Sequence, residues 1–201
     1  MKIELRSQYP AKQLGLPGGT LELSWKVFGA KAGETQTAYE IQSALDSEFT
    51  VELKSDQAKS SNSQFIKAPH IPSVSREISF HRVRIETQSG WSDWSETFTH
   101  ETGLLNGEEL IGHAIGDESK ATDPAALLRT TFTVTKPVAK ARLYATAHGT
   151  YDVMINGAKA GDHILAPGWT PYQHRLLVDS HDVTNHLVEG ENAFGVLLTD
   201  G

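Results

Sequence analysis

The chain contains no cysteine. Without thiols it can form neither a disulfide framework nor a thiolate metal site, and a cysteine nucleophile is excluded. The absence is typical of a reducing compartment. Residues 1–10 alternate in charge and lack the apolar segment of a signal peptide, so we expect a cytoplasmic protein, although a signal peptide already removed would leave the same pattern.

Long hydrophobic runs and clusters of positive charge are also missing. No stretch approaches the roughly 20 apolar residues that a membrane-spanning helix requires. The net charge is −7, from 18 lysines and arginines against 25 aspartates and glutamates, and the basic residues form no stripe. We therefore expect no nucleic acid and no membrane as partner, whereas neutral ligands such as sugars remain compatible.

Nucleophile, phosphate-binding and metal motifs are absent as well. The chain has no G-x-S-x-G, no G-x-x-x-x-G-K-[ST] and no G-x-G-x-x-G that opens a helix. The pairs His181/His186 and His163/His174 lack the H-E-x-x-H spacing, so we expect solvated surface histidines. We predict no metal site and no cofactor. Calcium held by loop oxygens needs no fixed motif and stays open.

Carboxylates are abundant, but no motif selects a pair of them. A glycosidase needs two, about 5 Å apart in a retaining enzyme and about 6.5–9.5 Å apart in an inverting one. The acidic candidates of the second half are Asp152, Asp162, Asp179, Asp182, Glu189, Glu191 and Asp200. Their places beside turns favour turn and capping roles, with Asp182 as a helix N-cap. We therefore predict no catalytic residue.

Short alternating segments between turns fill the first half and predict β-strands. In residues 21–28, Leu21, Leu23, Trp25 and Val27 alternate with polar residues. Further strands are predicted at 38–44, at 78–87 and through Phe98. Residues 1–20 are expected to be a loose lead-in, and the polar stretch 54–64 an exposed loop.

The segment Trp91-Ser-Asp-Trp94-Ser95 follows the strand at 78–87, which carries Arg82 and Arg84. Arginines two apart share one face of a strand, so both guanidinium groups could stack between Trp91 and Trp94 as a cation–π ladder. One interpretation is a ligand surface similar to that near the WSxWS box of cytokine receptors. We favour the other, a ladder that stiffens and protects a solvent-facing edge.

The second half contains stronger turn signals. Strands are predicted at 129–135, 142–147, 151–155, 175–178 and 193–198, with a short helical turn at 124–128 and another after Asp182. Asn156-Gly157 directly follows an extended run and predicts a tight hairpin. The acidic, glycine-rich stretch 101–120 has little periodicity and indicates a domain junction.

These patterns predict an all-β protein with two antiparallel β-sandwich domains in tandem. The first, residues 1–102, fits a fibronectin-type-III-like sandwich, which needs no disulfide. Residues 103–120 form the junction. The second domain occupies residues 121–201 and is expected to be incomplete at its C-terminus, because the chain stops directly after an apolar strand.

The second half contains, in order, the blocks YDVMINGAKAGD, LAPGWTPYQHR, DVTNHLVEGENAFGVLL and TDG. These blocks resemble the N-terminal β-sandwich region of bacterial α-L-rhamnosidases, whose upstream part is similar to a fibronectin-type-III-like module. The resemblance covers residues 100–201 well and residues 20–100 more loosely. At the junction the family typically carries tryptophans, where Leu110 and Ala114-Ile115 stand here.

The resemblance implies that the family's catalytic helical barrel would lie beyond Gly201. The chain would then be a non-catalytic, truncated N-terminal fragment of an α-L-rhamnosidase-like glycoside hydrolase, inactive by itself, with the missing catalytic domain of the same polypeptide as its partner. Its role would be to support that domain and to contact rhamnose-containing substrate. The resemblance thus implies that the enzyme activity belongs to the parent protein, an α-L-rhamnosidase, and not to this chain, from which the catalytic helical barrel is absent.

Sugar recognition is the functional interpretation with a mechanism. A pyranose stacks its apolar face on an aromatic ring and presents hydroxyl groups to polar side chains. Trp169 after a Pro-Gly corner, Tyr172, Asn156 and Asp162 provide those residue types. We favour the alternative that Trp169 and Tyr172 pack the sandwich edge or dock the missing barrel.

Two other hypotheses come from different classes of protein. The chain could be a free-standing carbohydrate-binding protein that uses its second sandwich, or a protein-interaction module built on the Trp91–Ser95 segment. The sequence selects neither the glycoside nor the oligomeric state.

Overall fold

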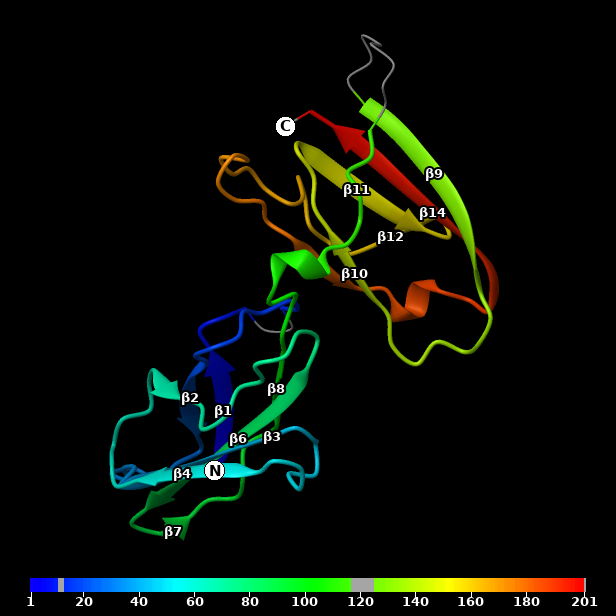
Figure 1. Ribbon diagram of the computed structural model, residues 1–201. Coiled ribbons are helices and arrows are strands. Elements are labelled where there is room, and N and C mark those ends of the chain that lie inside the picture. Colours follow the sequence, from blue (N-terminus) through cyan, green and yellow to red (C-terminus); the bar gives the residue numbers. More distant parts are fainter. Residues whose placement is uncertain (11–12, 117–124, 201) are drawn as a thin grey trace. The chain divides into compact units, whose positions relative to one another are not determined.

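The computed structural model describes residues 1–10, 13–116 and 125–200 and divides into two compact units, Met1–Glu109 and Leu110–Gly201 (Figure 1). The division falls inside residues 103–120. In the described residues, helix is limited to two short 3-10 turns, η1 (Gly107–Glu109) and η2 (Thr184–His186). None of the described helices has the length and apolar character of a membrane span. The predicted all-β fold with tandem sandwiches is confirmed.

Two antiparallel sheets form the first unit. One contains β1 (Lys2–Ser7), β2 (Glu22–Phe28) and β5 (Ile66–Lys67), in the order β1-β2-β5. The other contains β3 (Ala38–Ala44), β4 (Lys54–Ala58), β6 (Ile78–Thr87), β7 (Gly90–Trp91) and β8 (Phe98–Glu101). Its order is β4-β3-β6-β7, and β8 pairs with the other end of β6.

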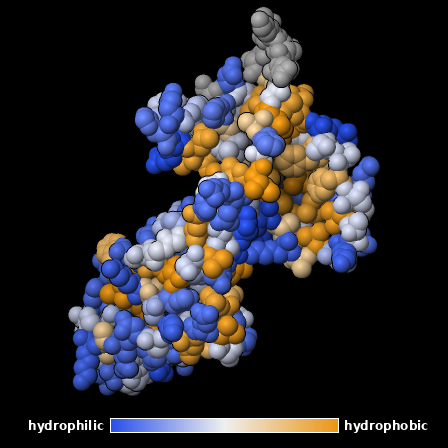
Figure 2. Space-filling view, viewed as in Figure 1, coloured by the Kyte–Doolittle hydropathy of each residue, from blue (hydrophilic) through white to orange (hydrophobic). Residues whose placement is uncertain are grey.

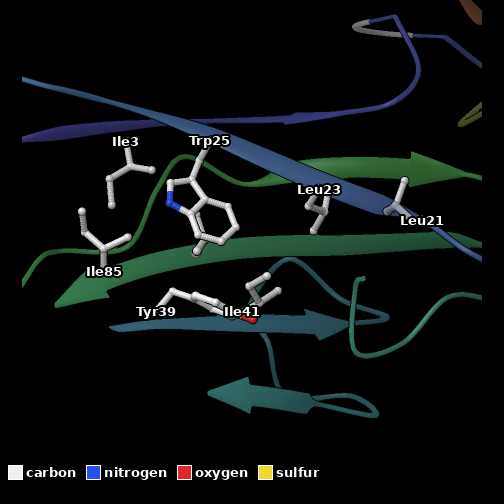
Figure 3. Packing of buried hydrophobic residues seen from close by; sticks show 8 residues of the cluster. Ile3, Leu21, Leu23, Trp25, Tyr39, Ile41 and Ile85 are labelled. Carbon is white, nitrogen blue, oxygen red and sulfur yellow. The ribbon is translucent and has the colours of Figure 1, made fainter. Parts of the chain in front are cut away.

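The core of the first unit comes from alternate residues of these strands. Trp25 of β2 meets Tyr39 of β3 edge to face, with ring centroids 5.2 Å apart (Figure 3). Ile3, Ile41 and Ile85 pack in the same cluster. Because the indole nitrogen of Trp25 donates to Gln36 Oε1 at 2.9 Å, the large ring is buried without leaving a polar atom unpaired.

Two predictions for this unit are wrong. Residues 2–7 form β1, in full register with β2, and residues 54–58 form β4 at the edge of the second sheet. A loose lead-in was expected because the end of this stretch is rich in glycine and proline. The alternation of Ile3 and Leu5 with polar residues, which is typical of a strand, was therefore overlooked. In β4, Lys54 to Gln57 are exposed, so an edge strand without a buried face carries no hydrophobic period.

The second unit has a larger and a smaller antiparallel sheet. The larger contains β9 (Ala125–Val134), β11 (Thr150–Ile155), β12 (Ala158–Lys159) and β14 (Gly190–Thr199), in the order β12-β11-β14-β9. The smaller pairs β10 (Arg142–Ala145) with β13 (Asp179–Asp182). Buried residues of β11, with Ala160, Ala166 and Val183, form the core of this unit.

The predicted Asn156-Gly157 hairpin is confirmed. Ile155 pairs with Ala158, and the two turn residues have φ values of 51° and 83°. The helical turn predicted at 124–128 is wrong in its described part, since residues 125–128 pair with β14; Pro124 lies outside the described residues. The strand predicted at 175–178 is also wrong, because the strand of this region is β13, from Asp179.

Candidate functional site

The structure brings Arg82, Arg84, Trp91 and Trp94 together on one face of the first unit. The Arg82 guanidinium carbon lies 4.5 Å from the Trp94 ring centroid, and that of Arg84 lies 4.7 Å from Trp94 and 5.0 Å from Trp91. Phe49, which the sequence analysis did not include, extends the stack at 3.9 Å from Arg82. The rings and cations therefore alternate along β6.

Serines of the same segment hold the tryptophans in place. The Ser92 amide donates to Ile85 O at 2.8 Å, and the Ser95 amide to Val83 O at 2.8 Å. Their hydroxyl oxygens accept from the Ile85 and Val83 amides, both at 3.1 Å. Residues 92–95 thus replace a regular strand at this edge of β6, with side chains completing the backbone pairing.

The guanidinium groups are also fixed from the neighbouring strand β3. Arg82 donates twice to Gln42 Oε1, at 2.9 and 2.7 Å, and Arg84 donates twice to Glu40 Oε2, at 2.8 and 2.6 Å. Burial opposes ionisation of Glu40, but Arg84 and Ser55 outweigh it and hold the pKa of the carboxyl below its ordinary value. Because both guanidinium groups already donate to acceptors within the protein, this arrangement favours the interpretation of the ladder as a feature that stiffens the sheet edge.

In the second unit, Trp169 lies on a long loop between β12 and β13 and is 78% exposed. Ile164 and Leu165 on the same loop are 85% and 69% exposed. Hydrogen bonds nevertheless hold this loop in place. Tyr151 N donates to Ala166 O at 2.9 Å, and Thr170 Oγ1 donates to Arg175 O at 2.6 Å. An ordered loop therefore presents large apolar side chains to solvent.

Tyr172 and Asn156 make contacts inside the unit. The Tyr172 ring stacks on His148 at 5.0 Å between centroids, and its hydroxyl oxygen accepts from Gly149 N at 3.0 Å. Asn156 Nδ2 donates to His186 O and Asn192 Oδ1, at 2.9 and 2.8 Å.

Asn156 also follows the end of β11, whereas Ala166, near Trp169, pairs with Tyr151 at the other end. At the usual strand rise these two points are about 16 Å apart. Asn156 and the corner that begins at Ala166 therefore lie at opposite ends of β11. Asp162 is exposed and lies near enough to His181 to influence the pKa of its imidazole.

A group that the sequence analysis missed is formed by His163, Asp179 and His181, whose potential ligand atoms all lie within 4.8 Å of one another. His163 Nδ1 is 3.6 Å from Asp179 Oδ1, and the His163 and His181 rings meet edge to face at 5.2 Å. The Tyr151 hydroxyl donates to Asp179 Oδ2 at 2.8 Å and lies 3.3 Å from His181 Nε2.

Burial and the neighbouring charges act in opposite directions on this group. Burial lowers the pKa of His181, and Asp179 raises it by a smaller amount, so the net direction is downward. Burial also raises the pKa of the Tyr151 hydroxyl, and its bond to Asp179 adds to the effect. The expectation of a surface histidine is wrong for His181, which is buried; His81 and His100 of the first unit are buried as well.

Two of the acidic candidates form ion pairs with basic side chains. Asp152 lies 2.6 Å from Lys159 Nζ, and Asp182 lies 2.9 Å from Arg142 Nη1. A shallow depression beside β11 has Asp152 as its one acidic lining residue; the lining is Thr150, Tyr151, Asp152, Leu165, Leu197 and Thr199. Burial opposes ionisation of Asp182, but the bonds from Thr184 and the charge of Arg142 outweigh it and hold the pKa of this carboxyl below its ordinary value, which does not suit the general acid of a glycosidase.

Comparisons with known proteins identify the two halves of the chain. Residues 3–106 match the family model described as Rha78A-like, N-terminal immunoglobulin domain, and residues 136–201 match the alpha-L-rhamnosidase N-terminal domain. Immunoglobulin and fibronectin-type-III domains share the sandwich architecture, so the finer fibronectin-type-III assignment stays a prediction.

Relatives of known name agree with these matches. An alpha-L-rhamnosidase of Formosa agariphila is 32% identical over 94% of this chain and 22% of its own length. The crystal structure of the Aspergillus terreus enzyme is 31% identical, with a TM-score of 0.84 over 100% of this chain and 24% of that one. The Dictyoglumus thermophilum structure is 28% identical, with a TM-score of 0.87 over 98% and 25%.

The chain spans about a fifth of the length of the curated relatives it matches. Two family models, in the same order as the two structural units, together account for most of its residues. The chain belongs to the α-L-rhamnosidase family and corresponds to the N-terminal region of its members.

Proposed function

We propose that this chain is the non-catalytic accessory region of an α-L-rhamnosidase and that its second unit supports the catalytic domain of the same polypeptide. The observation that carries the proposal is the exposed apolar loop with Ile164, Leu165 and Trp169 at 85%, 69% and 78% exposure. Figure 2 shows hydrophobic residues at the surface of this unit between hydrophilic ones. Large apolar groups held in water are typical of a docking surface.

The hydrogen bonds of this loop favour docking over random exposure. The Gly168 amide donates to Leu165 O at 3.0 Å, and His174 N donates to Pro171 O at 2.8 Å. A loop that is already ordered loses little conformational entropy when a partner covers it, so its apolar area contributes more fully to association. The proposed partner is the catalytic domain, which would lie in the part of the relatives' sequences that this chain does not span.

Replacement of Trp169 by serine tests the docking role. In the whole polypeptide, loss of the buried ring should lower the thermal unfolding midpoint of the catalytic part, because a large aromatic anchor contributes about 2 kcal/mol or more to an interface. In the isolated chain, the same change should leave the midpoint unchanged because the ring is exposed. An unchanged midpoint in both proteins would contradict the proposal.

A second function, contact with a rhamnose-containing carbohydrate, is favoured by the same exposed Trp169. The indole face is open, so an apolar sugar face could stack on it. Rhamnose titrations of the native chain and of Trp169→Ala, followed by calorimetry, distinguish this function from docking. We expect weak binding that is lost in the variant, and equal affinity in both proteins would exclude Trp169 from a sugar site.

A further inference from the structure

We propose that the second unit binds one divalent transition-metal ion, best represented by Zn²⁺, through His163, Asp179 and His181. Nothing in the sequence pattern selects these residues, because they come from a loop and from β13 and have no motif spacing. The fold alone places two imidazoles and a carboxylate side by side.

The geometry is close to that of a zinc site. Zinc ligands lie about 2.0–2.2 Å from the ion, so ligand atoms in a tetrahedral site are about 3.3 Å apart. Here His163 Nδ1 and Asp179 Oδ1 are already 3.6 Å apart, and no pair of ligand atoms exceeds 4.8 Å. The His163 side chain is 53% exposed, so a small movement of this ligand is sufficient to complete the site.

The residue types also select the ion. Two imidazoles and a carboxylate suit zinc, whereas calcium and magnesium prefer sites made of oxygen ligands. Three protein ligands leave the fourth position of a tetrahedral ion for water or for an exogenous oxygen ligand. The site therefore has the ligand number of an open zinc centre rather than of a closed structural one.

A supporting shell orients two of the three ligands. Tyr151 donates to Asp179 Oδ2 at 2.8 Å and so leaves Oδ1, the oxygen near His163, for the ion. Such second-shell bonds are a regular feature of metal centres. The His181 ring packs against Gly161, where a Cβ atom would lie 2.3 Å from Nδ1, so glycine permits this ring position.

An ion at this place would join the two ends of the loop that carries Trp169. His163 lies near the beginning of that loop, and Asp179 begins the strand that follows it. The inference does not depend on the proposed function, because metal binding can be measured without a catalytic domain or a sugar.

Calorimetric titration of the tag-free, chelator-treated chain with ZnCl₂ tests the proposal. We expect one ion per chain and at least tenfold weaker binding by His163→Ala, a change at an exposed position. His174→Ala is the matched control, because His174 is an exposed histidine of the same loop outside the cluster. Its affinity should equal that of the native chain. Tyr151→Phe keeps the ring and should weaken binding about tenfold by releasing Asp179.

Further results decide between specific binding and no site. Visible absorption of the Co²⁺-loaded chain should show the intense bands of four-coordinate cobalt, and they should weaken in His163→Ala. Absence of Zn²⁺ binding, or equal affinities in the native chain and His163→Ala, would overturn the proposal. Equal losses in His163→Ala and His174→Ala would also overturn it, because they would indicate unspecific surface binding. The cluster would then be an ion pair and hydrogen-bond network only.

Discussion

Among single residues, the buried His81 should make the stability of the first unit depend on pH. His81 is fully buried, with Ser43 Oγ 2.8 Å from Nδ1 and Ser79 Oγ 2.9 Å from Nε2. Burial lowers the pKa of His81 to about 3, and His100 and His70 act in the same direction. As the pH falls, the imidazole of His81 is therefore protonated in the unfolded chain before it is protonated in the folded chain. The stability that neutral His81 contributes is fully present above about pH 6.5, the pKa of histidine in the unfolded chain, and is lost as the pH decreases toward 3.

Between pH 7 and pH 5 this residue should lower the free energy of unfolding by about 2 kcal/mol. Urea unfolding of the native chain and of His81→Gln at both pH values measures the effect. The variant keeps a side chain that can bond Ser43 and Ser79 but does not titrate, so its stability should change less over this interval. A pH dependence equal to that of the native chain would show that His81 does not carry it.

The ladder residues make a second prediction at this scale. Replacement of Arg82 and Arg84 by alanine should lower the free energy of unfolding by roughly 1–2 kcal/mol, because cation–π contacts and stem packing are lost. Arg6→Ala, at an exposed strand position, is the control. The denaturation midpoint of the double variant is the measurement, and a midpoint equal to that of the control would contradict a stabilising ladder.

The sequence predicted this ladder because residues two apart in a strand share a face, and β6 alternates buried and partly buried residues along its length. Phe49 escaped prediction because it reaches the stack from a turn with a positive φ of 59°, distant from β6 in sequence. The same reason applies to His163 and Asp179. Their approach depends on the course of a loop, which local periodicity does not encode.

At the scale of elements, strands were predictable where one face is buried or where a turn is strongly specified. The Asn156-Gly157 hairpin satisfies both conditions, and the structure adds a network that the sequence did not indicate. Asn192 is buried, accepts from Val188 N at 2.9 Å and also accepts from Asn156 Nδ2. Asn156 Oδ1 accepts from Ala193 N at 2.8 Å, so the turn is bonded to β14.

Substitutions at Asn156 separate the network from the backbone conformation of the turn. Asn156→Gly tolerates the φ of 51° but loses the side-chain bonds, which should cost about 1–2 kcal/mol. Asn156→Ala loses the same bonds and also strains the backbone, so it should be less stable by about 1 kcal/mol more. Thermal unfolding gives the order, and equal stability of the two variants would argue against backbone strain at this position.

For the whole molecule, the sequence was sufficient to predict the two sandwiches and the family. It was not sufficient to predict the roles of individual site residues. Ordered blocks of turn and strand residues identify a family because they reflect a complete fold. Contacts such as those of Tyr172 with His148 and Gly149 require the folded chain. Only the structure therefore shows that the Trp169 side chain is exposed to solvent, whereas Tyr172 contacts His148 and Gly149.

The last prediction concerns catalysis by the chain as a whole. A glycosidase must hold one carboxyl group of raised pKa and a second carboxylate at a defined distance in a water-controlled cleft. Here Asp152 and Asp182 form ion pairs with Lys159 and Arg142, respectively, and, despite burial, Thr184 and Arg142 hold the pKa of Asp182 below its ordinary value. We therefore expect the purified chain to release no aryl group from an aryl α-L-rhamnoside. Turnover that disappears when a single carboxylate of residues 125–200 is replaced by its amide would contradict the non-catalytic role, because it would place the acid in this unit.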